Sequence, residues 1–290
     1  MQASLITTLL LPLALGVIMF GLGLHLKVAD FVRVVQMPRA VIVGLSAQML
    51  ILPPVAFLLC LAFELPPLLA VGLMLLAVSP GGATANVFSH LARGDVALNI
   101  TLTALNSALI LITLPLVVQW SMAYFLGSSG YVPPPVQKIV EVAAIILLPV
   151  SIGMLVRART PMLADRLERV VQPLSLLILL ALIVFTVHKE WALIRANALD
   201  IGSVCLLLNL ASMGIGYGVA LLTKLAPRQA VAIAFEVGVH NSTLAIFIAL
   251  SVLESPAMSI PAALYSLVMY FTAGALAWYF RRRHPVPAKT

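Results

Sequence analysis

Charged side chains are scarce in this sequence. Only 9% of its 290 residues are Asp, Glu, Lys or Arg, whereas about a quarter of the residues of a soluble domain are charged. Hydrophobic side chains make up 62% of the chain, and the mean hydropathy is +1.12. So few charges leave too little polar surface to face water around an apolar core of that size. We therefore exclude a soluble enzyme and a disordered chain, and we predict an all-α polytopic membrane protein.

Cysteines and clustered basic residues are also few. Cys60 and Cys205 both lie inside apolar runs, so we expect small core residues and no disulfide. The formal charge of +7 comes from basic residues scattered singly between apolar runs, which excludes a nucleic-acid-binding surface and is typical of topology determinants. The first apolar run has no basic segment before it and no cleavage site, which favours a true span over a signal peptide.

Apolar runs bounded by charges, Pro or Gly predict nine transmembrane helices, because backbone polar groups must be satisfied within the bilayer. The predicted spans are about 4–25, 39–62, 67–91, 96–124, 136–156, 170–188, 201–223, 229–252 and 258–280. Of the 17 Lys and Arg residues, all but Lys138, Lys189 and Arg195 fall on one side of this arrangement. The positive-inside rule makes that side cytoplasmic, with the N-terminus outside and the C-terminus inside.

The predicted loops are short, and the longest are Gly127–Pro135 and Arg157–Arg169. We therefore expect one integral membrane domain over residues 1–290. Chemistry must then occur within the bilayer or at its mouths, which favours transport over catalysis. A membrane-embedded enzyme would have only His90 or His240 with a nearby serine as a base and nucleophile, so we expect no enzyme.

Two predicted spans are interrupted by residues that do not fit a continuous helix. In the third span, Pro80-Gly81-Gly82 lies in mid-membrane. In the eighth span, polar residues surround Gly238. The two spans run in opposite directions, one in each half of the chain, as expected of an inverted-repeat secondary transporter. Alternatively, Pro80-Gly81-Gly82 is a simple kink and the polar residues hold helices together.

Glu236 is the acidic residue that lies well inside a predicted span, whereas the other acids fall in loops or within a turn of a span end. A carboxylate at that depth must be protonated, paired or bound to a cation. No Lys or Arg is predicted at comparable depth to pair with it. The remaining choices are a proton or a bound cation, unless Glu236 is a permanently protonated packing residue.

Further oxygen-bearing side chains are predicted at membrane depth. Gln48 precedes Pro53-Pro54, and Asn99, Thr103 and Asn106 share one helix face. Oxygen ligands around one carboxylate suit a hard monovalent cation. For Gln48 or Asn99 alone, a hydrogen bond between helices is an equal alternative.

The segments PGGATANVFSHLARGDVAL, from Pro80, and EVGVHNSTLA, from Glu236, together with Gln48 ahead of a proline, resemble the bile acid:sodium symporter family over nearly the whole chain. The resemblance implies panel helices at about 4–25 and 136–188, and core helices at about 39–124 and 201–280. It also implies a nine-helix form of an inverted-repeat fold in which the two broken helices cross.

The resemblance implies two sodium sites at this crossing. The first comprises Asn86, Asn99, Thr103 and Glu236. The second comprises Gln48, Glu236, the carbonyls of Val237 and Val239, and the residue at 240.

Two positions depart from the family pattern. Ala85 replaces a serine that would supply a hydroxyl ligand, and His240 replaces a glutamine. Imidazole is a poor sodium ligand, but near a carboxylate it can carry a proton. Proton coupling through Glu236 and His240 therefore stays open, and a cation/proton antiporter is a weaker alternative because it normally needs a second deep charge.

We predict a sodium-coupled symporter that brings an organic anion, a bile acid-like molecule or a small carboxylate, across a cell membrane such as the bacterial inner membrane. The anion is expected at the N-terminal ends of the second half-helices. The predicted substrate-binding residues are Thr84, Asn86, Asn241 and Ser242. Sodium ions, the substrate and the lipid bilayer are the expected partners, with no cofactor, no nucleic acid, and a monomer or weak oligomer.

Overall fold

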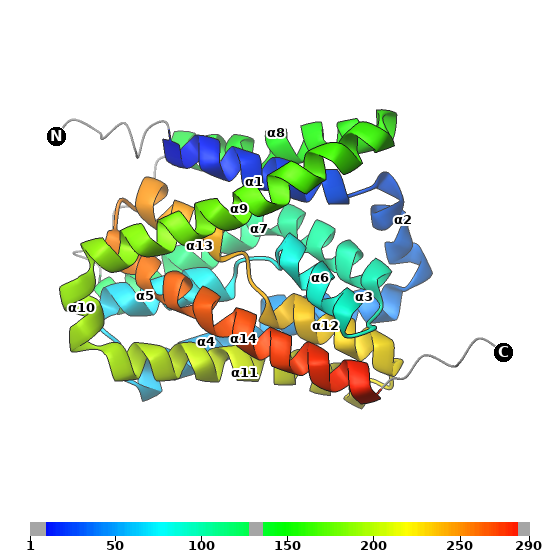
Figure 1. Cartoon of the computed structure of the whole chain (residues 1–290). Coiled ribbons are helices and arrows are strands. Elements are labelled where there is room, and N and C mark those ends of the chain that lie inside the picture. The colour runs from blue at the N-terminus through cyan, green and yellow to red at the C-terminus, as the bar shows by residue number, and fades with distance from the viewer. Residues whose placement is uncertain (1–9, 128–135, 284–290) are drawn as a thin grey trace.

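The computed structural model describes residues 10–127 and 136–283, and within these ranges every regular element is a helix (Figure 1). The first half contains α1 (Leu11–His25), α2 (Val28–Gln36), α3 (Pro38–Ser46), η2 (Ala47–Ile51), α4 (Leu52–Ala62), α5 (Pro67–Ala77), α6 (Ala83–Leu91) and α7 (Val96–Leu126). The second half contains α8 (Val136–Arg159), α9 (Pro161–Lys189), α10 (Trp191–Ala196), α11 (Ala198–Leu222), α12 (Pro227–Gly238), α13 (Ser242–Phe247), η3 (Ile248–Val252), η4 (Pro256–Ser259) and α14 (Ile260–Arg283).

The predicted spans coincide with helices or with interrupted pairs of helices. Five helical segments of the described chain are long and apolar enough to cross a membrane, or six if α1 and α2, which are bent by 57°, count as one span. The chain is thus a multi-pass membrane protein. The count of nine spans and the inverted repeat stay predictions. The first residues of the predicted span 4–25 and most of the loop Gly127–Pro135 lie outside the described residues.

Two of the predicted connections are wrong in detail. The expected loop Arg157–Arg169 is almost entirely helical, because α8 continues to Arg159 and α9 begins at Pro161. Pro161 suits the first turn of a helix, where its missing N–H costs nothing. The segment after α1 was not predicted to be regular, yet it forms α2, in which the Asp30 carboxylate accepts hydrogen bonds from the Lys27 N–H and Arg33.

Helices α1, α8 and α9, the predicted panel helices, pack against one another along one side of the molecule (Figure 1). Gly23 on α1 lies against α8, where a Cβ atom would come within 2.2 Å of the Val150 carbonyl oxygen. Small residues allow such a close approach of helix backbones in membranes. The division of the chain into panel and core stays a prediction.

Gly23→Ala is expected to destabilise the protein by about 1–3 kcal/mol, because the new methyl group meets the backbone of α8 and not a movable side chain. Thermal unfolding in detergent measures the effect. Gly202→Ala is the matched control, since a Cβ at Gly202 meets nothing within 4 Å. Equal unfolding temperatures for the two variants would contradict this account of the helix contact.

Both predicted helix interruptions are present. Helix α5 ends at Ala77 and α6 begins at Ala83, so Pro80-Gly81-Gly82 lies between them. Helix α12 ends at Gly238 and α13 begins at Ser242. Gly81 and His240 form an isolated antiparallel bridge. The two breaks therefore meet in the interior of the protein.

Candidate functional site at the crossing of two broken helices

Backbone hydrogen bonds join the two breaks directly. The Gly82 N–H donates to the Val239 carbonyl oxygen at 3.3 Å, and the Asn241 N–H donates to the Pro80 carbonyl oxygen at 2.8 Å. Broken helices leave backbone groups without their usual partners, and here each break satisfies part of the other. The crossing is thus a fixed structural unit, in which Val239 already uses its carbonyl for one such bond.

Glu236 lies at this crossing and is completely buried. Its Oε2 accepts a hydrogen bond from Thr103 Oγ1 at 2.6 Å, and its Oε1 accepts one from Asn106 Nδ2 at 2.8 Å. Gly81 lies directly beside the carboxylate, because a Cβ atom built on Gly81 would come within 2.5 Å of Oε2. All these donors are neutral, and no ion pair of the described residues includes Glu236. A carboxylate in such a place lacks a compensating positive charge from the protein.

Buried amide oxygens on the neighbouring segments lack hydrogen-bond partners. Asn99 donates through Nδ2 to the Ala232 carbonyl oxygen at 2.8 Å and thereby joins α7 to α12. The buried side-chain amide oxygens without a partner belong to Gln48, Asn86, Asn99 and Asn106. An unpartnered polar atom in a protein interior is costly. These oxygens are therefore unused acceptors that could bind a cation.

Gln48 and His240 meet at one backbone carbonyl. Gln48 Nε2 donates to the Ser79 carbonyl oxygen at 3.0 Å, and His240 Nδ1 lies 2.9 Å from the same oxygen. A carbonyl only accepts, so Nδ1 carries the proton of this hydrogen bond. His240 Nε2 has no partner in the described structure. The structure therefore brings Gln48 and His240 together, but no hydrogen bond joins His240 to Glu236.

Side chains from α11 and α14 fix the end of α12. The Gly238 carbonyl oxygen accepts hydrogen bonds from Asn209 Nδ2 at 3.0 Å and from the Tyr265 hydroxyl at 2.8 Å. These two donors replace the helix N–H that the interruption removes. Val237, the residue between Glu236 and Gly238, is fully buried in this last turn. The network holds the carbonyls after Glu236 in place.

We expect Tyr265→Phe to cost only about 0.5–1.5 kcal/mol of unfolding free energy, because Asn209 still donates to Gly238. Asn209→Leu combined with Tyr265→Phe should cost more than the sum of the two single changes, since the buried carbonyl then has neither donor. A double-mutant cycle in detergent unfolding tests this. Strict additivity would show that the two side chains act on separate features.

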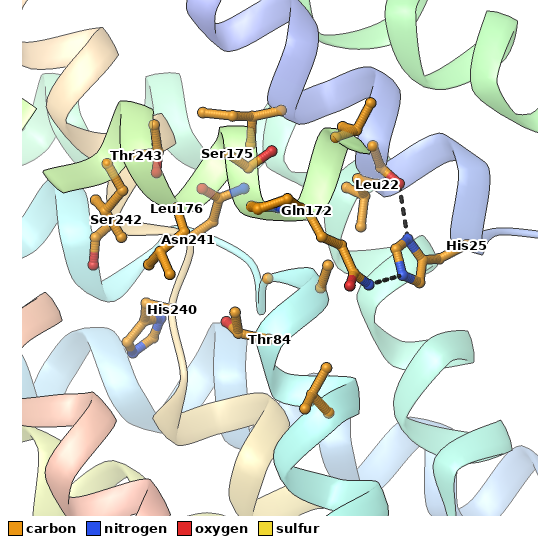
Figure 2. A pocket seen from close by; sticks show the side chains of 18 of the residues that line it. Leu22, His25, Thr84, Gln172, Ser175, Leu176, His240, Asn241, Ser242 and Thr243 are labelled. Atoms are coloured by element: carbon orange, nitrogen blue, oxygen red, sulfur yellow. Dashed lines mark hydrogen bonds between the residues drawn. The ribbon is translucent and has the colours of Figure 1, made fainter. Parts of the chain in front are cut away.

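A cavity of about 430 Å³ lies beside the crossing (Figure 2). One part of its lining comes from the starts of α6 and α13, and the other from α1, α9 and α14. Leu22, Val171, Leu176 and Leu179 give it largely apolar walls. Such a mixture of apolar walls and a few polar groups is typical of small-molecule sites.

Three of the four predicted substrate-binding residues line this cavity. Thr84 lies in the first turn of α6, and Asn241 caps α13 by accepting a hydrogen bond from the Leu244 N–H at 3.1 Å. Ser242 also lines the cavity, and its buried hydroxyl has no partner. Asn86 is not part of the lining. Asn86 is buried and its amide has no partner, so it stays a predicted cation ligand only.

Comparisons with known proteins decide the family. The family model described as the sodium bile acid symporter family matches residues 12–197. The chain belongs to this family. The uncharacterized sodium-dependent transporter YocS of Bacillus subtilis is 30% identical over 269 residues, which cover 93% of this chain and 82% of YocS.

Two human relatives are also similar. The ileal sodium/bile acid cotransporter is 26% identical over 83% of this chain and 69% of its own length. P3 protein is 33% identical over 82% of this chain, and the matched region covers half of P3 protein. Membership of the sodium bile acid symporter family confirms the resemblance that the motifs indicated, and the names of YocS and of the ileal protein are those of transporters.

Several residues of this member of the sodium bile acid symporter family were not predicted to be part of the site. Asn106 was placed on the correct helix face but not in the cation set, although it contacts Glu236 directly. His25, Gln172 and Glu168 line the cavity from α1 and α9. In sequence, His25 ends one predicted span, Gln172 lies near the start of another, and Glu168 falls in an expected loop, so no local signal indicated that α1 and α9 face the crossing.

Proposed function

We propose that this protein is a secondary active transporter that couples the inward movement of sodium to the uptake of a small organic anion. The observation that carries the proposal is the buried Glu236 carboxylate at the crossing, whose hydrogen-bond donors are all neutral. A charge in such a place requires a counter-ion that arrives from outside the protein.

Sodium fits this place better than a proton does. Sodium prefers oxygen ligands, and the amide oxygens of Gln48, Asn86, Asn99 and Asn106 are buried without a hydrogen-bond partner, so they are available as ligands. A proton on Glu236 would leave these oxygens without a role. The proton alternative relied on a Glu236–His240 pair, and His240 Nδ1 instead hydrogen-bonds Ser79. We therefore keep sodium as the proposed coupling ion.

The proposed cycle follows from charge and geometry. A sodium ion bound to Glu236 neutralises the crossing and holds α6, α7 and α12 together. The neighbouring N-terminal ends of α6 and α13 then offer backbone N–H groups and the polar groups of Thr84 and Ser242 to an anion. The core helices next move relative to α1, α8 and α9, so that the cavity is exposed to the other side.

The membrane potential supplies the energy. Each sodium ion that moves inward gains about 2.3 kcal/mol per 100 mV. Two sodium ions with one monovalent anion therefore make uptake electrogenic and accumulate the substrate. The cytoplasmic side in this proposal is the side that the basic residues predict.

Uptake into proteoliposomes tests the proposal. The protein is reconstituted with an inward sodium gradient, an inward proton gradient, or neither, and uptake of labelled carboxylates is measured. Uptake driven by sodium and increased by an inside-negative potential is expected. Uptake that ignores sodium and follows the proton gradient would reverse the assignment of the coupling ion.

A further inference from the structure

The described lining of the cavity lies in one half of the molecule. Both α1 and α9 line it through the half that is next to basic residues, which are Lys27 after α1 and Arg169 in the first part of α9. The basic residues predict that this side is cytoplasmic. In Figure 1 it is the side of α2 and α12, whereas α10 and α13 lie at the other side. Gln172, at this end of the cavity, is exposed, so a ligand can reach the cavity from the cytoplasmic side.

The outer halves of the same two helices are packed. Among the described residues of α9, Leu179 is the last that lines the cavity, and Ile183 and Thr186 follow it at helical spacing. Both of these residues are buried, Thr186 completely. Leu15 in the outer half of α1 is also buried, and α1 packs against α13. Buried side chains therefore fill the outer half, where the inner half has a cavity.

Two buried hydroxyl groups join α9 to η4 at this packed end. Ser259 Oγ donates to the Pro256 carbonyl oxygen at 2.6 Å, and Thr186 Oγ1 lies 3.0 Å from Ser259 Oγ. A hydroxyl has one hydrogen to donate, so in this pair Thr186 donates and Ser259 accepts. Both side chains are fully buried. Separation of α9 from η4 would leave the Thr186 hydroxyl without its partner, which is costly until water reaches it.

Helix η4 is attached to α5 on the other side of this contact. Gly72 on α5 lies so close to η4 that a Cβ atom would come within 2.2 Å of the Met258 carbonyl oxygen. Movement of η4 along α5 would therefore meet backbone atoms and not a movable side chain. We expect η4 to move with α5. The hydrogen bond between Thr186 and Ser259 then lies between the two groups of helices that the proposed cycle moves relative to each other.

We propose that this structure is the inward-facing state of the transporter and that Thr186 and Ser259 form its outer gate. Their hydrogen bond holds the outer half closed while the cavity is accessible from the cytoplasmic side. It breaks when α9 moves so that the cavity faces outward, and water that enters the opened path then hydrogen-bonds both hydroxyls. This inference rests on the proposed function, which requires that movement.

Cysteine labelling measures how often the gate opens. Ile183→Cys places a thiol beside Thr186 in the closed half, and the native Cys60 and Cys205 are buried and contribute little background. A membrane-impermeant maleimide is applied to intact cells that express the protein. Thr186→Val keeps the size of the side chain but removes the hydrogen bond. Labelling of Ile183→Cys should then become about threefold faster, as expected for a hydrogen bond of average strength between membrane helices.

Thr113→Val is the matched control for this substitution. Thr113 donates to the Leu109 carbonyl oxygen at 3.2 Å, within the single helix α7. Its replacement also removes one hydroxyl from a membrane helix but does not touch the contact between α9 and η4. The labelling rate of Ile183→Cys should therefore stay unchanged in this background.

A disulfide in place of the hydrogen bond provides the second arm. The two hydroxyl oxygens are 3.0 Å apart, so the thiols of Thr186→Cys and Ser259→Cys should lie within reach of each other. Oxidation of this double variant should stop the sodium-driven uptake of labelled butyrate or cholate, and a reductant should restore it. Uptake by each single-cysteine variant should be insensitive to the oxidant.

The outcomes separate the gate from the proposed function. An unchanged labelling rate in Thr186→Val, a double variant that does not cross-link, or full uptake after complete cross-linking would overturn the gate alone. If the wild type takes up neither probe under a sodium gradient, that result counts against the proposed function, and the labelling rates still test the gate.

Discussion

Glu236→Gln is expected to abolish sodium-coupled uptake. A cation about 4 Å from a carboxylate gains about 4 kcal/mol at an effective dielectric constant of 20. Removal of the charge should therefore weaken sodium binding by several hundredfold. The fold should persist, because glutamine has nearly the same size and the Asn106 amide can still donate to its side-chain oxygen. Uptake under an imposed sodium gradient, with unfolding temperature measured in parallel, tests both expectations.

Glu190→Gln is the matched control for this change. It also removes one carboxylate from the chain, but at the end of α9, away from the crossing. The control should retain sodium-coupled uptake. Wild-type uptake by Glu236→Gln would remove the central role of Glu236, whereas loss of uptake in both variants would point to a general effect of lost charge.

Gly81→Ala is also expected to weaken sodium binding, without altering any polar group. A Cβ atom at Gly81 would lie 2.5 Å from Glu236 Oε2 and 2.6 Å from both Oε1 and Cδ. Atoms do not approach so closely, so the carboxylate must leave its hydrogen bonds to Thr103 and Asn106. Sodium affinity should fall by at least about tenfold, because loss of the hydrogen bonds that orient a metal ligand typically lowers metal affinity 10- to 100-fold.

Gly82→Ala provides the comparison within the same break. A Cβ at Gly82 meets its nearest atom, Thr84 Oγ1, at 3.5 Å, which is an ordinary contact. Its extended backbone also accommodates alanine. Stabilisation by sodium, measured without substrate, should therefore persist in Gly82→Ala and be lost in Gly81→Ala. Similar sodium responses would show that the contact between Gly81 and the carboxylate does not position Glu236.

Much of the fold was predictable because its strongest signals are local. Pro80-Gly81-Gly82 prevents a continuous helix whatever surrounds it, and in the structure this segment separates α5 from α6. Glu236 stood out because an acid within an apolar run is costly in any membrane arrangement. The extent of α9 was missed, because the charged residues before its apolar run suggested a loop. In the structure, that polar part is a continuation of the same helix.

The partners of the site residues were less predictable, because they depend on tertiary contacts. His240 was assigned to Glu236 from their closeness in sequence, but its imidazole hydrogen-bonds Ser79, which lies 161 residues earlier in the chain. Asn106 shares a helix face with Asn99 and Thr103, yet only the packing of α7 against α12 shows that it contacts the carboxylate. His25 lines the cavity because α1 packs against α9, and no local sequence pattern specifies that contact.

The most direct test is equilibrium binding of radiolabelled sodium to the purified wild-type protein and to Glu236→Gln, with potassium as the competing ion. The account predicts saturable sodium binding to the wild type that potassium displaces poorly, and no saturable binding to the variant. Equal sodium binding by the two proteins, or no saturable binding by either, would contradict the claim that a sodium ion neutralises Glu236 at the crossing.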